Sequence, residues 1–265
     1  MKRYFLTFGT VLLLSSMVMT NVEVATATSK TGDGTITFEE MEEDTGVRDP
    51  EKPDTSVDPG PSPSTEGKLR IDFVPQLNFS SNSILNKNRL YPVNAQLFKD
   101  DTGPRANFVQ VSDYRGGSFG WSLQLRQETQ FKNEQTQNSQ LNGAILSFDK
   151  SWANSRQETK FAPVVSQDII QLNNIGEAYV LAEAKPDTGS GTWSISFGAS
   201  NSNQSGQKDT LKPKVDSNGQ PIVDPDFNNK QVYENNAITL SIPEATKIDP
   251  VDYTTVLTWV LAELP

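Results

Sequence analysis

The residues that could carry out chemistry in this chain are carboxylates, because the sequence contains no histidine and no cysteine. This composition removes the usual nucleophile and base pairings, all thiol mechanisms and the commonest zinc ligands. Acidic pairs occur at Asp100-Asp101 and at Asp224-x-Asp226, and a glycosidase would use such a pair. Neighbouring acids in polar loops are also expected by chance and stay solvated. We therefore predict no catalytic residue and no enzymatic activity.

Two segments begin like ligand-binding loops and then depart from the required pattern. Residues 216–227, DSNGQPIVDPDF, start like a calcium loop, but Pro221 stands at the sharp-turn glycine position and Phe227 at the position of the bidentate glutamate. Residues 115–120, RGGSFG, are glycine-rich but lead into a predicted strand rather than into a helix N-terminus that could hold phosphate. We expect no metal and no cofactor.

Two Trp-x-Leu tripeptides are the most informative pattern in the chain. They are Trp121-Ser122-Leu123 and Trp259-Val260-Leu261. In a strand, residues two apart share one face, about 6.6 Å apart along the chain, so each Trp and its Leu point the same way. Each Trp falls on the apolar face of its predicted strand, where burial of about 200 Å² would stabilise a core by roughly 5 kcal/mol at most. Two interpretations stay open: both Trp side chains are core, or at least one contacts a ligand.

Two further tryptophans limit what the Trp-x-Leu spacing can indicate. Trp193-Ser194-Ile195 has the same spacing, so the spacing alone does not define a ligand site. Trp152 lies in DKSWANSRQ, outside any clear alternation. It could stack on a sugar ring or cover one end of the fold, and it joins Trp121, Leu123, Trp259 and Leu261 as a candidate ligand-binding residue.

The elements that would position these residues are strands separated by turns, with no convincing helical period. Residues 67–265 are predicted to form one all-β domain, a β-sandwich of the Ig-like or jelly-roll-like kind. The strands are expected at residues 69–73, 108–113, 119–126, 141–149, 177–184, 191–198, 237–242 and 251–262. Residues 127–140 are polar and are expected to form a loop or an exposed hairpin. Residues 199–236 are expected to be a polar insertion at a sandwich edge, with a hairpin tip at 217–220.

The N-terminus has the features of an export signal. Lys2 and Arg3 precede an apolar run over residues 4–19, and Ala25-Thr26-Ala27 offers the small residues of a cleavage site. We expect residues 1–27 to be a signal peptide cut after Ala27, which leaves no transmembrane segment after processing; the alternative is an uncleaved anchor. The exported chain would then be held together without disulfides.

Residues 28–66 are acidic and rich in proline. They contain 11 acidic and 3 basic residues, whereas residues 67–265 contain 21 and 18. We expect a short strand at residues 35–38, followed by an extended, solvated tether over residues 39–66. Two alternatives are a recognition segment, or a loop if the short strand pairs with the main domain. Neither part has the basic patch that nucleic acid or anionic lipid requires.

The chain resembles the WxL-domain family of Gram-positive bacterial surface proteins. The resemblance runs in order from GTITFEE through LRIDFVPQLNF, NFVQVSDYRGG, GWSLQL, LNGAILSF, GTWSISF and AITLSIPEA to LTWVLAELP. The two paired tripeptides, one of them close to the C-terminus, make it rather specific. It implies a secreted protein attached non-covalently to the cell wall, with peptidoglycan as ligand. It also implies assembly with other surface proteins, including membrane-anchored partners.

Charge limits how such a protein could bind a wall rich in anionic polymers. With a net charge of −10, bulk attraction is excluded, so binding would need hydrogen bonds, aromatic stacking and local cations. Arg115, Arg126 and Arg156 are the cations that could meet carboxylates of the stem peptides. The chain ends at Pro265 without a Leu-Pro-x-Thr-Gly sorting signal, from which we expect non-covalent retention.

Three classes of function remain at this point. The first is a wall-binding surface protein. The second is a structural subunit or adhesin that binds partner proteins or a host molecule, and the third is a secreted carbohydrate-active enzyme. We favour the first.

Overall fold

The computed structural model describes residues 46–84, 89–117 and 119–264. The chain divides into two units, Met1–Glu40 and Met41–Pro265, and every described residue belongs to the second. The predicted signal peptide, residues 1–27, and the predicted short strand, residues 35–38, lie outside the described residues. Within the described part, no helix is both long enough and apolar enough to span a membrane.

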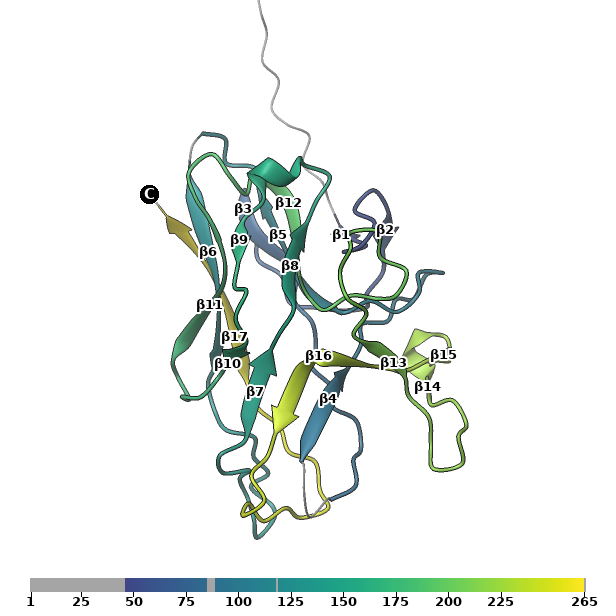
Figure 1. Cartoon of the computed structure of the whole chain (residues 1–265). Helices are drawn as coiled ribbons and strands as arrows, with labels where there is room; N and C mark the ends of the chain where they lie inside the picture. Colours follow the sequence, from purple (N-terminus) through teal and green to yellow (C-terminus); the bar gives the residue numbers. More distant parts are fainter. Residues whose placement is uncertain (1–45, 85–88, 118, 265) are drawn as a thin grey trace, which may run out of the picture. The chain divides into compact units, whose positions relative to one another are not determined.

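The described residues form antiparallel sheets (Figure 1). One sheet has the order β3 (Leu69–Phe73), β5 (Asn107–Asp113), β12 (Gly191–Phe197) and β8 (Ser151–Asn154). A second has the order β17 (Leu257–Leu264), β6 (Gly120–Gln127), β11 (Ala178–Ala184) and β9 (Val164–Val165). A third has the order β10 (Ile170–Gln171), β7 (Ile145–Phe148), β16 (Tyr233–Ser241) and β13 (Leu211–Pro213), with β4 (Leu90–Asn94) also paired to β16.

The smaller elements complete the described chain. They are the two-stranded pairs β1 (Val47–Arg48) with β2 (Ser56–Val57) and β14 (Val223–Asp224) with β15 (Lys230–Gln231), and the 3-10 turns η1 (Thr159–Phe161) and η2 (Pro225–Phe227). The prediction of an all-β fold is confirmed.

One apolar core joins the three larger sheets. It takes Val111 from β5, Leu123 from β6 and Leu146 from β7, together with neighbours from each sheet. All three of these side chains are fully buried. The sheets therefore cover a shared interior, as in a β-sandwich, and each contributes one apolar face to it.

Every strand expected within residues 67–265 is present, but several boundaries differ, and β16 begins at Tyr233 instead of at residue 237. The strand expected at 141–149 begins at Ile145, and the one expected at 251–262 begins only at Leu257 and continues to Leu264. Val251 and Val256 lie in the loop that precedes β17, and both are exposed. Their apolar side chains therefore did not indicate a strand. Among the strands of the three larger sheets, β4, β8, β9, β10 and β13 were not predicted. Pro92 in β4 and the short polar SWAN sequence of β8 hide the usual alternation.

The solvated tether expected over residues 39–66 is wrong for the segment of the β1–β2 hairpin, whereas Pro61 and residues 63–66 are exposed as expected. Val47 and Val57 pair in the β1–β2 hairpin, and Val57 packs in a cluster with Phe73 and Phe108. Asp49, only 1% exposed, accepts two hydrogen bonds from the Arg105 guanidinium at 2.8 Å each. Acidic composition predicted solvation, but a buried cation 56 residues away holds this acid inside the domain.

The second buried acid, Glu51, also holds the segment of the β1–β2 hairpin to the rest of the domain. Glu51 accepts hydrogen bonds at 2.6 Å from the backbone amide and from the hydroxyl of Ser200. Burial by itself would lower the pKa of Arg105, but the hydrogen bond and charge of Asp49 and the charge of Glu51 outweigh it and raise that pKa. The arginine therefore stays charged where it is buried.

The two polar segments behave in part as expected. The predicted hairpin tip is present, with the Asp216 amide donating to the Gln220 carbonyl at 2.9 Å. The strand β13 lies at the edge of its sheet beside β16, so the polar insertion is at a sheet edge. Of the segment expected at 127–140, Gln127 ends β6 and the rest forms a loop tied by a bridge between Lys132 and Gln140. Phe131 in this loop is nevertheless buried in the core.

Candidate functional site

The first tripeptide belongs to the core. Trp121 and Leu123 are both 0% exposed, on a strand that has β17 on one side and β11 on the other. The indole N–H of Trp121 donates to the Gly189 carbonyl at 3.1 Å, so its one polar group is satisfied inside the protein. These two side chains have no surface with which to contact a ligand.

The second tripeptide lies at the edge of the same sheet. In the antiparallel pairing of β17 with β6, Trp259 is opposite Leu125 and Leu261 is opposite Leu123. Both Trp259 and Leu261 are half-buried and pack against the core from outside. The structure thus brings the two tripeptides side by side and leaves only the second within reach of solvent.

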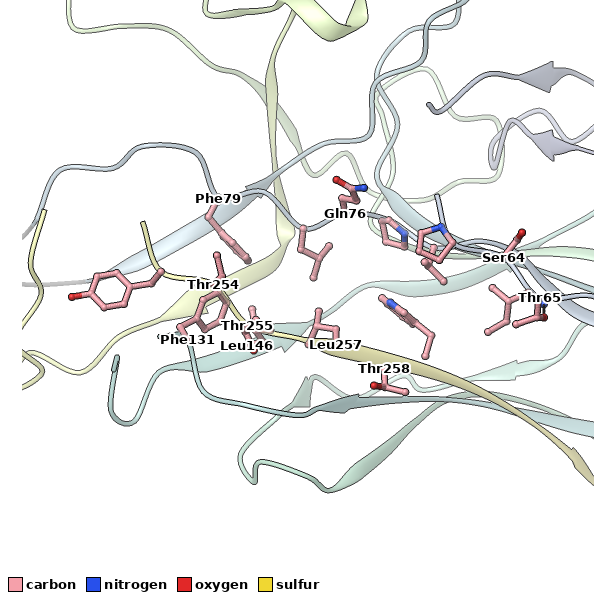
Figure 2. Close-up of a pocket in the computed structure, with 17 residues that line it drawn as sticks. Ser64, Thr65, Gln76, Phe79, Phe131, Leu146, Thr254, Thr255, Leu257 and Thr258 are labelled. Carbon is pink, nitrogen blue, oxygen red and sulfur yellow. Dashed lines mark hydrogen bonds between the residues drawn. The ribbon is translucent and has the colours of Figure 1, made fainter. Parts of the chain in front are cut away.

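A groove of about 550 Å³ opens beside Trp259. Its volume is within the range of ligand sites. Gln76 and Phe79 lie on one side of it, and Thr254, Thr255 and Leu257 lie on the other (Figure 2). The residues that line it are Pro63, Ser64, Thr65, Ile71, Val74, Pro75, Gln76, Leu77, Phe79, Phe131, Leu146, Tyr253, Thr254, Thr255, Leu257, Thr258 and Trp259.

The groove has an apolar floor and a polar rim. Ile71, Phe131 and Leu146 are buried core residues at its base. Ser64, Thr65, Gln76 and Thr254 are exposed residues with hydroxyl or amide groups, while Phe79 and Trp259 are half-buried between floor and rim. None of the lining residues, all of them in the described part, carries a charge. The groove is suited to an uncharged ligand that offers both apolar faces and hydrogen-bonding edges.

The Tyr253 side of the groove is fixed by a carboxylate outside it. Asp249 accepts hydrogen bonds from the Thr136 hydroxyl and from the Asn138 backbone and side-chain amides. These hydrogen bonds, that of Thr136 first, lower the pKa of Asp249. The Tyr253 hydroxyl donates to the Asn138 carbonyl at 2.8 Å, so the loop before β17 and the loop containing residues 127–140 are held together.

Arg115 lies in a different place and is already paired. Its guanidinium donates to Asp113 at 2.8 Å and to the Gly120 carbonyl at 2.9 Å, and it lies over the Phe119 ring, 5.4 Å from the centroid. The hydrogen bond that Arg115 donates to Asp113 is the main reason that the pKa of Arg115 is raised. Arg115 borders a second, smaller hollow with Phe119 and Phe161, not the groove beside Trp259.

The remaining candidates do not contribute to the groove. Trp152 is 6% exposed, and its indole N–H donates to the Gly198 carbonyl at 2.7 Å. With so little exposed surface, the ring is unsuited to stacking on a sugar, and the alternative, a cover over one end of the fold, stays a prediction. Arg126 pairs with Glu128 at 2.7 Å, and neither Arg126 nor Arg156 lines the groove.

The acidic pairs considered from sequence also have structural roles. Asp100 accepts hydrogen bonds from the Asp58 and Thr102 amides. Burial acts to raise the pKa of Asp100, but the hydrogen bond from the Thr102 side chain, the two amide hydrogen bonds and the charge of Lys230 outweigh burial and lower it. Asp224 caps the turn η2 by accepting from the Asp226 amide at 2.9 Å. Among the residues that the structure describes, no group of three acids could hold a metal ion.

Comparison with known protein families shows the family of the chain. The family model described as the WxL domain, surface cell wall-binding, matches residues 25–265. The chain belongs to the WxL-domain family. No curated protein and no solved structure matches it. Membership in a wall-binding family rather than an enzyme family gives this WxL protein a role at the cell surface in cell-wall binding.

Several groove residues of the WxL domain could not be found from the tripeptides. Phe79, Gln76 and Phe131 come from irregular segments outside the regular strands. In the sequence, Phe79 and Phe131 were marked only by an aromatic side chain in polar surroundings, and nothing marked Gln76. The match from residue 25 onward also includes the β1–β2 hairpin within the family region, in agreement with its burial.

Proposed function

We propose that this WxL protein is retained on the bacterial wall by non-covalent binding of peptidoglycan in the groove beside Trp259. The observation that carries the proposal is the uncharged lining of that groove next to the one tripeptide that reaches solvent. N-acetylated sugar rings have apolar faces and neutral polar edges. The rings of Phe79 and Trp259 suit the faces, and Gln76 and the rim hydroxyls suit the edges.

This proposal replaces the expected role of local cations. Arg115 and Arg126 hold carboxylates of the protein itself, so binding through them would first have to break those pairs. Neutral contacts in a partly desolvated groove are screened little by salt. Retention on a wall rich in anionic polymers then needs no favourable net charge, which suits a chain with a net charge of −10.

A sedimentation assay with purified peptidoglycan tests the site. Trp259→Ala should reduce retention at least about tenfold, since it removes the largest ring of the groove. Val256→Ala is the matched control, because Val256 is exposed near the groove and does not line it. Circular dichroism would establish that both variants are folded.

The outcomes separate the proposal from its alternatives. A folded Trp259→Ala variant retained as well as wild type would place the site elsewhere. Release of wild type by moderate salt would favour charged contacts instead. No retention on bare peptidoglycan, together with binding to another surface protein, would favour the structural-subunit alternative.

A further inference from the structure

The last described strand is a sheet edge that carries one charged residue, Glu263. β17 pairs with β6 on one side, and among the described residues no strand pairs with its other side. Six of its residues are apolar, and it contains neither lysine nor proline. Natural edge strands usually carry such residues to prevent association with other strands. An eight-residue edge with six apolar residues and neither lysine nor proline is suited to pairing.

The hydrogen-bond pattern shows which backbone groups face this open edge. The Glu128 amide donates to the Val256 carbonyl at 2.9 Å, and these two residues continue the β6–β17 register by one position. In an antiparallel ladder, residues alternate between facing one neighbour and facing the other. Thr258, Val260 and Ala262 therefore face β6, whereas Leu257, Trp259, Leu261 and Glu263 direct their N–H and C=O groups outward.

A second observation supports this alternation. Gln127 lies opposite Leu257, and its carbonyl accepts from the Gly176 amide at 2.8 Å, on the β11 side of β6. Gln127 thus faces away from β17, and its opposite residue Leu257 must face away from β6. The backbone groups of Trp259 and Leu261 themselves form the middle of the open edge.

We propose that β17 pairs in antiparallel fashion with β17 of a second copy of this chain, about a two-fold axis at Val260. In an antiparallel pair, two opposed residues direct their backbone N–H and C=O groups either both toward each other or both away from each other. The outward-facing residues of one β17 must therefore lie opposite the outward-facing residues of the other. The register centred on Val260 meets this condition for all four outward-facing residues of β17. It places Trp259 opposite Leu261 of the second copy, and Leu257 opposite Glu263.

The side chains agree with this register. Opposed residues lie on the same face of a sheet, so Trp259 and Leu261 of one copy would meet Leu261 and Trp259 of the other on the face that borders the groove. Glu263, 72% exposed as a side chain, would lie opposite a leucine and not opposite a like charge. Net repulsion between two acidic chains would weaken the dimer, and it is screened beyond about 8 Å at physiological ionic strength. Added salt should therefore strengthen association.

Cysteine cross-linking tests the register, because the wild-type sequence contains no cysteine. Two Val260 residues would face each other as a non-hydrogen-bonded pair about 4.5 Å apart between Cα atoms, within disulfide range. Mild oxidation of the Val260→Cys variant, purified after export without residues 1–27, should give a disulfide-linked dimer. Thr258→Cys is the matched control, since its two copies would lie about 13 Å apart along the strands and should give at least about tenfold less dimer. Equal yields from both variants would overturn the proposal.

A second pair of variants tests the edge without a covalent link. Glu263→Pro removes an outward N–H and leaves the β6 ladder intact, so the dimer dissociation constant in sedimentation equilibrium should rise about tenfold. Glu263→Ala, which equally loses the contact with Arg115, should leave that constant near the wild-type value. Neither change alters a groove residue, so a failed dimer with intact peptidoglycan retention is distinguishable from failure of the proposed function. A wild-type protein that stays monomeric at every concentration, or a monomer whose Trp259 and Leu261 amides resist hydrogen exchange, would overturn the dimer.

Discussion

Leu123 and Leu261, the last residues of the two Trp-x-Leu tripeptides, lie directly opposite each other in the pairing of β6 with β17. The tryptophans are consequently offset, with Trp121 opposite Glu263 and Trp259 opposite Leu125. β6 has a neighbour on both sides, while β17 is at the sheet edge. The first tripeptide therefore supports the second from inside the core, and the second borders the groove.

The two tryptophans should respond differently to truncation. Trp121→Ala would open a cavity in a fully buried site and leave the Gly189 carbonyl without its donor, so it should lower the free energy of unfolding by about 3–5 kcal/mol. Trp259→Ala, at a half-buried edge, should lower it less. Urea unfolding followed by far-ultraviolet circular dichroism measures both. Equal losses would contradict the assignment of Trp121 to the core and Trp259 to the groove.

Gly189 should not accept a side chain. It has a positive φ of 73°, and a Cβ added there would lie 2.6 Å from the Trp121 Nε1 and 2.4 Å from the Ala184 Cβ. Gly176 is the control, because it has a similar φ of 81° and nothing within 4 Å of an added Cβ. Gly176→Ala should lower the free energy of unfolding by about 1–2 kcal/mol from backbone strain. Gly189→Ala should cost more, since it also displaces Trp121; thermal unfolding of the two variants gives the comparison.

The buried ion pair predicts that the β1–β2 hairpin is an integral part of the domain. Asp49→Ala would leave the Arg105 guanidinium, whose side chain is 6% exposed, buried without its main partner. The loss should be about 3–5 kcal/mol. Glu134→Ala breaks a pair of similar length, 2.7 Å to Lys132, between exposed side chains, and should have little effect on the free energy of unfolding. Similar denaturation midpoints for the two variants would mean that the hairpin adds no stability.

Asp249 predicts a pH dependence with a defined sign. Its pKa is lowered in the folded protein by hydrogen bonds from Thr136 and Asn138, so its contribution to stability is present above the ordinary value of 3.8 and is lost as the pH falls through the lowered value. Wild type should therefore exceed Asp249→Asn in stability at neutral pH, and the difference should shrink as the pH falls below that ordinary value. Unfolding measured across the acidic range tests this. A difference that grew with acidification would contradict it.

The sequence predicted the strands well because alternation is a local property. The ranges expected for β3, β5, β6, β11 and β12 match within about two residues. Errors arose where local composition and tertiary contacts disagree. Asp49 and Glu51 have the composition of a solvated tether, but Arg105 and Ser200 bind them inside the domain. Trp152 lacked a clear alternation and is nevertheless buried.

By itself, the sequence determined the all-β class, the faces on which the tryptophans lie and the family to which the chain belongs. These follow from residue types and from a period of two along the chain. Only the tertiary structure decided that Trp121 is enclosed and that Trp259 borders a groove. The two tripeptides have the same local pattern, and they differ because strand order gives β6 two neighbours and places β17 at the edge. Exposure depends on what packs around a strand, and that packing comes from residues distant in the sequence.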